Sequence, residues 1–153
     1  MYLEKINSPD DLKRLVLPEL ETLSDEIRTL IIEVVSKNGG HLSSSLGVVE
    51  LTLALHYVFD TPVDKIIWDV GHQCYTHKII TGRREKFRTL RQDNGISGFP
   101  SRQESVYDVF NTGHASNSIS IAVGLSEAKK KMNQSHKIVT VIGDGSLTGG
   151  MSF

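Results

Sequence analysis

The residues best suited to chemistry in this 153-residue sequence are three histidines and one aspartate, each next to glycine. His41, His72 and His114 each follow a glycine directly, and Asp144 lies between two glycines. Imidazole titrates near neutral pH and can move protons, whereas a carboxylate binds hard cations. The pattern indicates one pocket that collects all four side chains and combines proton transfer with cation binding.

Asp144 closely follows a run of β-branched residues, 138–142. A short apolar run without alternation is typical of a strand buried on both faces of a parallel sheet. Open α/β sheets bind small molecules beyond the carboxyl ends of their strands, so Asp144 is expected at the binding edge. Gly143 and Gly145 let the backbone approach a ligand closely. The predicted ligand is a diphosphate that backbone amides hold and Mg²⁺ bridges to Asp144.

Other phosphate and metal motifs fit this turn less well. A P-loop needs lysine and then serine or threonine after its second glycine, but Gly145 is followed by Ser146, Leu147 and Thr148. The dinucleotide fingerprint needs glycine or alanine where Thr148 stands. Structural zinc sites use paired cysteines or histidines, and the sequence has one cysteine, Cys74. A single cysteine forms no intramolecular disulfide, which fits a reducing compartment.

The elements around these residues are expected to alternate between helices and strands. Apolar residues at three and four residue spacing predict a long helix from Pro18 to the glycines at 39 and 40. Residues 41–47 are small and polar and predict a loop, and residues 48–59 are apolar nearly all round and predict a central, buried helix. A second strand is expected at 66–70.

The second half of the chain continues this alternation. A helix is expected from Tyr75 to Arg91 with a solvent-exposed basic face, followed by an irregular segment at 93–108. A further helix carries apolar residues from Ile119 to Ala128. The sequence thus predicts one α/β domain with a mostly parallel sheet and flanking helices.

The composition indicates which partners and locations to expect. The formal net charge is −1, so neither nucleic acid nor a membrane surface is an expected partner. No secretory or transit signal and no apolar run of membrane-spanning length is found, and we expect a cytoplasmic protein. The chain stops soon after a strand, before the helix that should cover it, so we expect a piece of a longer protein.

Five motifs carry a resemblance to a known family. The chain is similar to the transketolase-like, thiamine-diphosphate-dependent 1-deoxy-D-xylulose-5-phosphate synthases in GGHLSSSLGVVELTLALHYVF, IIWDVGHQCYTHKIITGRR, SGFPSR and TGHASNSISIAVGL. The fifth motif, GDGSLTGG, resembles the opening of the thiamine-diphosphate motif, whose closing asparagine would lie beyond Phe153. The resemblance implies that residues 1–153 form the N-terminal part of the cofactor domain, without the pyrimidine-binding and C-terminal domains, and are inactive alone.

The resemblance also implies a reaction and a set of site residues. A homodimer would condense pyruvate with D-glyceraldehyde 3-phosphate, releasing CO₂, in the synthesis of isoprenoids, thiamine and pyridoxal. His41 and His72 would be catalytic, and Asp144 would bind Mg²⁺. The implied cofactor contacts are His72, Gly113, His114, Ala115, Gly145 and Ser146. Serine is more usual in the family at positions 115 and 117, so Ala115 would contribute a backbone contact only.

Two alternatives to this function stay open at the level of sequence. The chain could belong to another transketolase-like enzyme, although the narrower motifs favour the synthase. It could also be a non-catalytic module that binds the cofactor or supports assembly on the same scaffold.

Overall fold

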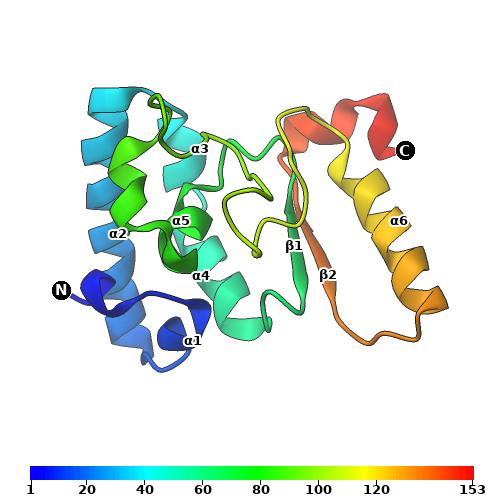
Figure 1. Ribbon diagram of the computed structural model, residues 1–153, viewed down its shortest axis with the longest axis horizontal. Helices are drawn as coiled ribbons and strands as arrows, with labels where there is room; N and C mark the ends of the chain where they lie inside the picture. The colour runs from blue at the N-terminus through cyan, green and yellow to red at the C-terminus, as the bar shows by residue number, and fades with distance from the viewer. The chain divides into compact units, whose positions relative to one another are not determined.

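The structure is a computed structural model that describes residues 1–153 and divides into two compact units (Figure 1). Residues 1–59 and 72–98 form the first, which contains only helices and is called the helical unit. Residues 60–71 and 99–153 form the second, called the sheet unit, which contains both strands.

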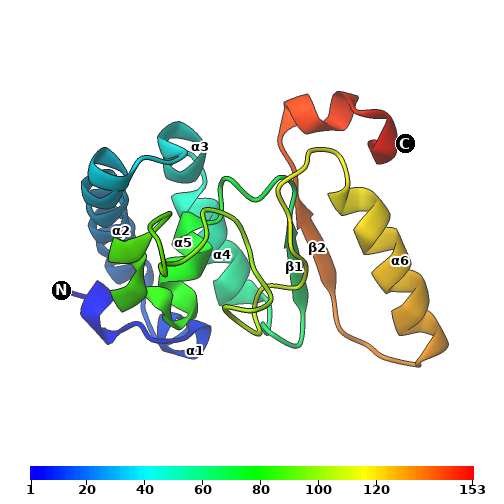
Figure 2. The ribbon, with the colours of Figure 1, turned by 45° about the horizontal axis from the view of Figure 1, so that its top comes forward.

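The helical unit is built around one long helix (Figure 2). Glu19 starts α2 by accepting the backbone N–H of Val16 at 2.9 Å, and Gly39 ends it with a φ of 74°. Its buried face carries Leu23, Ile27, Ile31, Val34 and Val35, as the spacing predicted. The α-helices of this unit are α1 (Pro9–Leu12), α2 (Leu17–Asn38), α3 (Leu42–Leu46), α4 (Val49–Val58) and α5 (Tyr75–Lys78).

The predicted loop at 41–47 is wrong, because Leu42–Leu46 form the short helix α3. A run of serines has little helix propensity of its own, and contacts within the unit stabilise this turn instead. Arg28 donates to the carbonyl of Leu46 at 2.6 Å, and the buried hydroxyl of Ser45 donates to the carbonyl of His72 at 3.1 Å.

The prediction that the next helix is buried all round is also wrong, although its bounds are close. α4 packs on α2 and α5 through one face, formed by Val49, Thr52, Leu53 and His56. Val58 on the other side is 69 % exposed. Periodicity could not reveal this, because α4 has polar Thr52 and His56 on its buried face and apolar residues such as Leu51 and Val58 on its exposed face.

The single helix predicted at 75–91 is broken into three pieces. After α5 the chain makes a π-helical turn, Ile79–Arg83, which leaves helical geometry at Thr81 and at Gly82, where φ is 86°. A 3-10 helix follows at Glu85–Thr89. Arg83 is buried and donates to the hydroxyl of Thr81 at 2.8 Å, so the predicted solvent exposure fails there. Residues 93–108 contain no helix or strand, as predicted.

The sheet unit confirms the predicted fold class. Strands β1 (Lys65–Trp68) and β2 (Ile138–Val141) pair in parallel, with Lys65 opposite Ile138 and Trp68 opposite Val141. Helix α6 (Ser118–Lys131) packs on β2, which makes the α/β arrangement (Figure 1). Each strand ends earlier than predicted, and 3-10 helices follow β2 at Asp144–Thr148 and Gly150–Ser152.

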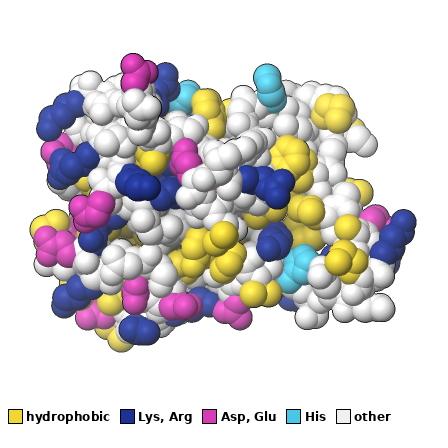
Figure 3. Space-filling model, in the orientation of Figure 1, with side chains coloured by type: hydrophobic (Ala, Val, Ile, Leu, Met, Phe, Trp, Pro, Cys, Tyr) yellow, Lys and Arg dark blue, Asp and Glu magenta, His cyan; other side chains and the backbone are white.

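The surface carries charges of both signs. On the face in Figure 3, basic and acidic side chains lie interspersed, and apolar side chains form patches among them. None of the helices combines the length and the apolar character needed to cross a membrane.

Two histidines share the core of the helical unit. His56 from α4 and His77 from α5 are both buried, with Nε2 of His56 2.9 Å from Nδ1 of His77. Burial lowers the pKa of His56 well below its usual 6.5, and the positive charges of His77, Arg83 and Lys13 lower it further. His56 is therefore neutral in the folded chain at neutral pH.

The stability of the chain is expected to fall as the pH drops below 6.5. Unfolded His56 binds a proton near its usual pKa of 6.5, whereas folded His56 does not until a lower pH. The contribution of neutral His56 to the free energy of unfolding is complete above pH 6.5. It is lost at up to about 1.4 kcal/mol per pH unit as the pH falls. Urea denaturation on both sides of this value measures the loss. His56→Gln should flatten the dependence, and an equally steep variant would contradict the assignment.

Candidate functional site

The structure brings His41 and His72 together. Their ring centroids lie 5.4 Å apart in an edge-to-face arrangement within the helical unit. The backbone N–H of His41 donates to the hydroxyl of Tyr75 at 3.1 Å, and the carbonyl of His72 accepts the hydroxyl of Ser45. The backbone that carries each imidazole is therefore held in place by a buried side chain, Tyr75 for His41 and Ser45 for His72.

Gly40 makes the position of His41 possible. Its φ is 142°, which side chains rarely adopt, and a Cβ there would lie 2.5 Å from the hydroxyl oxygen of Tyr75. The glycine before His41 thus lets the chain pass close to Tyr75. The sequence reasoning did not single out Tyr75, whose neighbours give no local signal of this contact.

In the sheet unit, Asp144 begins the 3-10 helix that follows β2. Its side chain is exposed, and its Oδ1 accepts the backbone N–H of Gly145 at 2.9 Å. A Cβ at Gly143 or Gly145 would meet nothing within 4 Å, so the backbone on both sides of Asp144 is open to a ligand. This is the position predicted from the glycines.

The segment 113–116 lies against that turn. Ser116 is buried, and its hydroxyl donates to the carbonyl of Ser146 at 2.7 Å. The three residues before it, Gly113, His114 and Ala115, are exposed. The structure therefore joins the two stretches of the sheet unit in which cofactor contacts are predicted.

The sheet-unit residues suit a diphosphate with a hard cation. Mg²⁺ in proteins is usually bound by one or two carboxylates, with phosphate and water oxygens completing the octahedron. Asp144 offers one exposed carboxylate, and open backbone flanks it. No group of three or more His, Cys, Asp or Glu residues in the chain is arranged to hold a metal ion. Asp144 would hold the cation together with oxygens of the diphosphate.

The four predicted side chains fall into two pairs. His41 and His72 belong to the helical unit, and His114 and Asp144 belong to the sheet unit. Each pair is placed within its own unit. That the pairs share one pocket stays a prediction.

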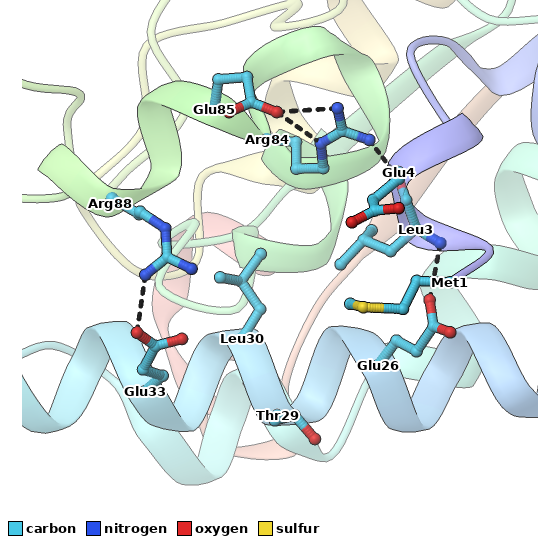
Figure 4. Close-up of a pocket in the computed structure, with 10 residues that line it drawn as sticks. All are labelled: Met1, Leu3, Glu4, Glu26, Thr29, Leu30, Glu33, Arg84, Glu85 and Arg88. Atoms are coloured by element: carbon cyan, nitrogen blue, oxygen red, sulfur yellow. Dashed lines mark hydrogen bonds and ion pairs between the residues drawn. The ribbon is translucent and has the colours of Figure 1, made fainter.

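A cavity of about 410 Å³ in the helical unit is separate from all the predicted site residues. Figure 4 shows that its charged groups largely neutralise one another: Arg88 contacts Glu33 at 2.7 Å, and Arg84 contacts Glu85 at 2.8 Å. Glu26 accepts the backbone N–H of Leu3 at 2.7 Å. These contacts join the N-terminal segment and the 3-10 helix Glu85–Thr89 to α2, so the residues that line the cavity have a structural role.

The sequence reasoning also missed Asp69. It follows β1 directly, is 1 % exposed, and accepts the backbone N–H groups of Ser116 and Ser118. Burial raises the pKa of Asp69, but these hydrogen bonds outweigh burial, so the pKa lies below its usual value of 3.8. The predicted strand at 66–70 contained Asp69, so its position beyond the end of β1 is evident only in the structure.

Comparison with known proteins gives a match along the chain. The profile of the family described as 1-deoxy-D-xylulose-5-phosphate synthase matches residues 3–153. The chain belongs to this family. Proteins of this name are similar to it: 62 % identical in Caldanaerobacter subterraneus subsp. tengcongensis over 98 % of the chain, and 64 % identical in Syntrophomonas wolfei over 99 %.

A third relative, from Thermomicrobium roseum, is 61 % identical over 100 % of the chain. The matching segment is 24 % of each of these three relatives. The chain therefore spans about a quarter of the length of the curated relatives that it matches.

Gly40→Ala is expected to destabilise the chain by about 1 to 3 kcal/mol, because the new methyl group meets Tyr75 and the backbone is strained. Urea denaturation measures the loss. Tyr75→Phe in the same chain removes the oxygen that the methyl group meets, so the double variant should recover part of the loss. Additive losses in the double variant would show that the close contact does not matter.

Proposed function

We propose that this chain forms the diphosphate and Mg²⁺ side of the thiamine-diphosphate site in a 1-deoxy-D-xylulose-5-phosphate synthase. The reaction is the condensation of pyruvate with D-glyceraldehyde 3-phosphate to 1-deoxy-D-xylulose 5-phosphate and CO₂. The match of residues 3–153 to that family carries the proposal. The position of Asp144 beyond β2, in an exposed glycine-flanked turn, supports it at the level of chemistry.

The residues of the sheet unit would bind the cofactor. Asp144 supplies the carboxylate for Mg²⁺, and the backbone of Gly145 and Ser146 lies beside it to meet the diphosphate. The exposed segment Gly113–Ala115 provides further contacts, since Ser116 ties it to the carbonyl of Ser146 at 2.7 Å. His72 would be a cofactor contact from the helical unit.

The histidines would handle protons. When bound, thiamine diphosphate supplies the electron sink that decarboxylation of a 2-oxo acid requires. Imidazole has a usual pKa close to neutrality, so His41 and His72 can donate and accept protons at their ring nitrogens during the reaction. Their edge-to-face contact at 5.4 Å lets both reach one small substrate.

The wider setting is proposed from family resemblance. The active protein would be a cytoplasmic homodimer that takes pyruvate and D-glyceraldehyde 3-phosphate as substrates. A non-catalytic, cofactor-binding module is the competing function, because the chain spans 24 % of its relatives. A chimera distinguishes the two: this chain replaces the segment that it matches in the Caldanaerobacter relative, and product formation is measured. A chimera that binds cofactor without turnover would favour the module.

Asp144→Ala in this chimera is expected to abolish Mg²⁺-dependent binding of thiamine diphosphate while the protein stays folded. A ligand at about 100 times its Kd stabilises the folded state by about 2.7 kcal/mol, so thermal unfolding with and without cofactor measures the loss. Asp93→Ala removes an exposed acid of the helical unit and is the control, which should keep the full shift. Equal shifts in both variants would refute the metal assignment.

His41→Asn in the chimera is expected to lower kcat by about 10²- to 10⁴-fold, the range for loss of a positioned acid or base. Cofactor affinity should change little, because His41 is assigned to proton transfer and not to the diphosphate. Steady-state kinetics and a cofactor titration separate the two effects. His136 belongs to neither of the two predicted pairs, so His136→Asn is the matched control and should keep the parent rate. A parent-like kcat in His41→Asn would show that His41 does not take part in proton transfer.

A further inference from the structure

Asp69 occupies a particular place in the sheet unit. It is the first residue after β1, and its backbone N–H donates to the carbonyl of Val141 at 2.8 Å, which extends the strand pairing by one bond. Its side chain is 1 % exposed. A carboxylate buried this deeply is stable only where donors meet its oxygens.

The donors come from the start of α6. Oδ1 of Asp69 accepts the N–H of Ser116 at 2.9 Å, and Oδ2 accepts the N–H of Ser118 at 3.0 Å. Ser118 is the first residue of α6, whose opening N–H groups have no partners within the helix. The negative charge also suits the positive end of the helix. Asp69 therefore anchors α6 and the segment before it to the end of β1.

Ser116 links this anchored segment to the turn after β2. It holds a φ of 72°, unusual for a residue with a side chain, and its hydroxyl donates to the carbonyl of Ser146 at 2.7 Å. Ser152 donates to the same carbonyl at 3.0 Å. A Cβ on Gly149 would lie 2.0 Å from Oγ of Ser116, so glycine is needed for this approach.

We propose that Asp69 is a positioning residue for the cofactor site: through Ser116 it fixes Gly113–Ala115 and the Asp144–Ser146 turn relative to each other. This role rests on the proposed function, because those two segments are the proposed diphosphate and Mg²⁺ contacts. Asp69 does not touch the cofactor in this scheme. It holds the backbone that does.

The same strand carries a matched control. Asp64 lies just before β1 and also accepts two backbone N–H groups, from Lys137 at 2.6 Å and from Asp60 at 2.9 Å. It sits at the opposite end of the strand pair from Asp69 and Asp144. Asp64→Asn and Asp69→Asn make the same chemical change at the two ends of β1.

Asp69→Asn keeps the size of the side chain, but one of its two acceptors becomes an amide donor that faces an N–H. In the Caldanaerobacter chimera, it should weaken Mg²⁺-dependent binding of thiamine diphosphate about 10- to 100-fold, as loss of an outer hydrogen bond does at metal sites. Asp64→Asn should change the affinity less than threefold. Ser116→Ala keeps the bond to Asp69 but removes the hydroxyl that donates to Ser146 and leaves only the bridge through Ser152, so it should weaken binding in the same direction as Asp69→Asn.

Hydrogen exchange without cofactor gives an independent measurement in the same proteins. Asp69→Asn should speed exchange at 116–118 and also at 144–149, whereas Asp64→Asn should act near Lys137. Unchanged exchange at 144–149 in both Asp69→Asn and Ser116→Ala would overturn the proposed link. Parent-like cofactor affinity in both variants would overturn the positioning role.

A parent chimera that binds no thiamine diphosphate would instead contradict the proposed function, and the cofactor role of Asp69 would fall with it. The exchange pattern would still decide whether Asp69 couples the two segments. If Asp69→Asn does not fold, Ser116→Ala alone decides, since it leaves the buried carboxylate and both of its donors in place.

Discussion

Parallel strands place their carboxyl ends at one edge of a sheet, and the pairing of β1 with β2 does this for Asp69 and Asp144. The register sets Trp68 opposite Val141, so the chain leaves both strands side by side. α6 lies between the two strands in the sequence and packs on β2, so its first turn lies at the same edge. One backbone interaction thus gathers a buried acid, an exposed acid and a helix start. The glycines and serines of this region refine an arrangement that the pairing creates.

Carboxylates that accept backbone N–H groups hold much of the irregular backbone in place. Asp69 and Asp64 do so at the two ends of β1, and buried Asp108 accepts the N–H of Ser101 at 2.7 Å within the irregular segment. Glu26 does the same for the N-terminal residues. Hydrogen bonds to charged acceptors are stronger than neutral ones. Segments with little regular structure can therefore keep fixed conformations and present exposed residues such as His114.

The elements that the sequence predicted well are those whose signals are local. α2 and α6 follow from apolar spacing, and the turn at Asp144 follows from its glycines and the strand before it. α3 could not be predicted, since Arg28 bonds Leu46 and His72 bonds Ser45 from distant positions in the chain. The role of Asp69 was hidden for the same reason: its donors lie 47 and 49 residues along the chain. Elements with local signals were therefore predicted, whereas contacts between residues far apart in the chain were not.

Buried titratable groups are stabilised in opposite ways in the two units. His56 is kept neutral by burial among positive charges, whereas Asp69 is kept charged by backbone donors. Acid removes the contribution of each group to the free energy of unfolding, but in separate pH ranges. The contribution of His56 declines below pH 6.5, while that of Asp69 is complete above 3.8 and declines only below it. The start of α6 and the turn after β2 thus keep their anchor under mildly acidic conditions that already weaken the core of the helical unit.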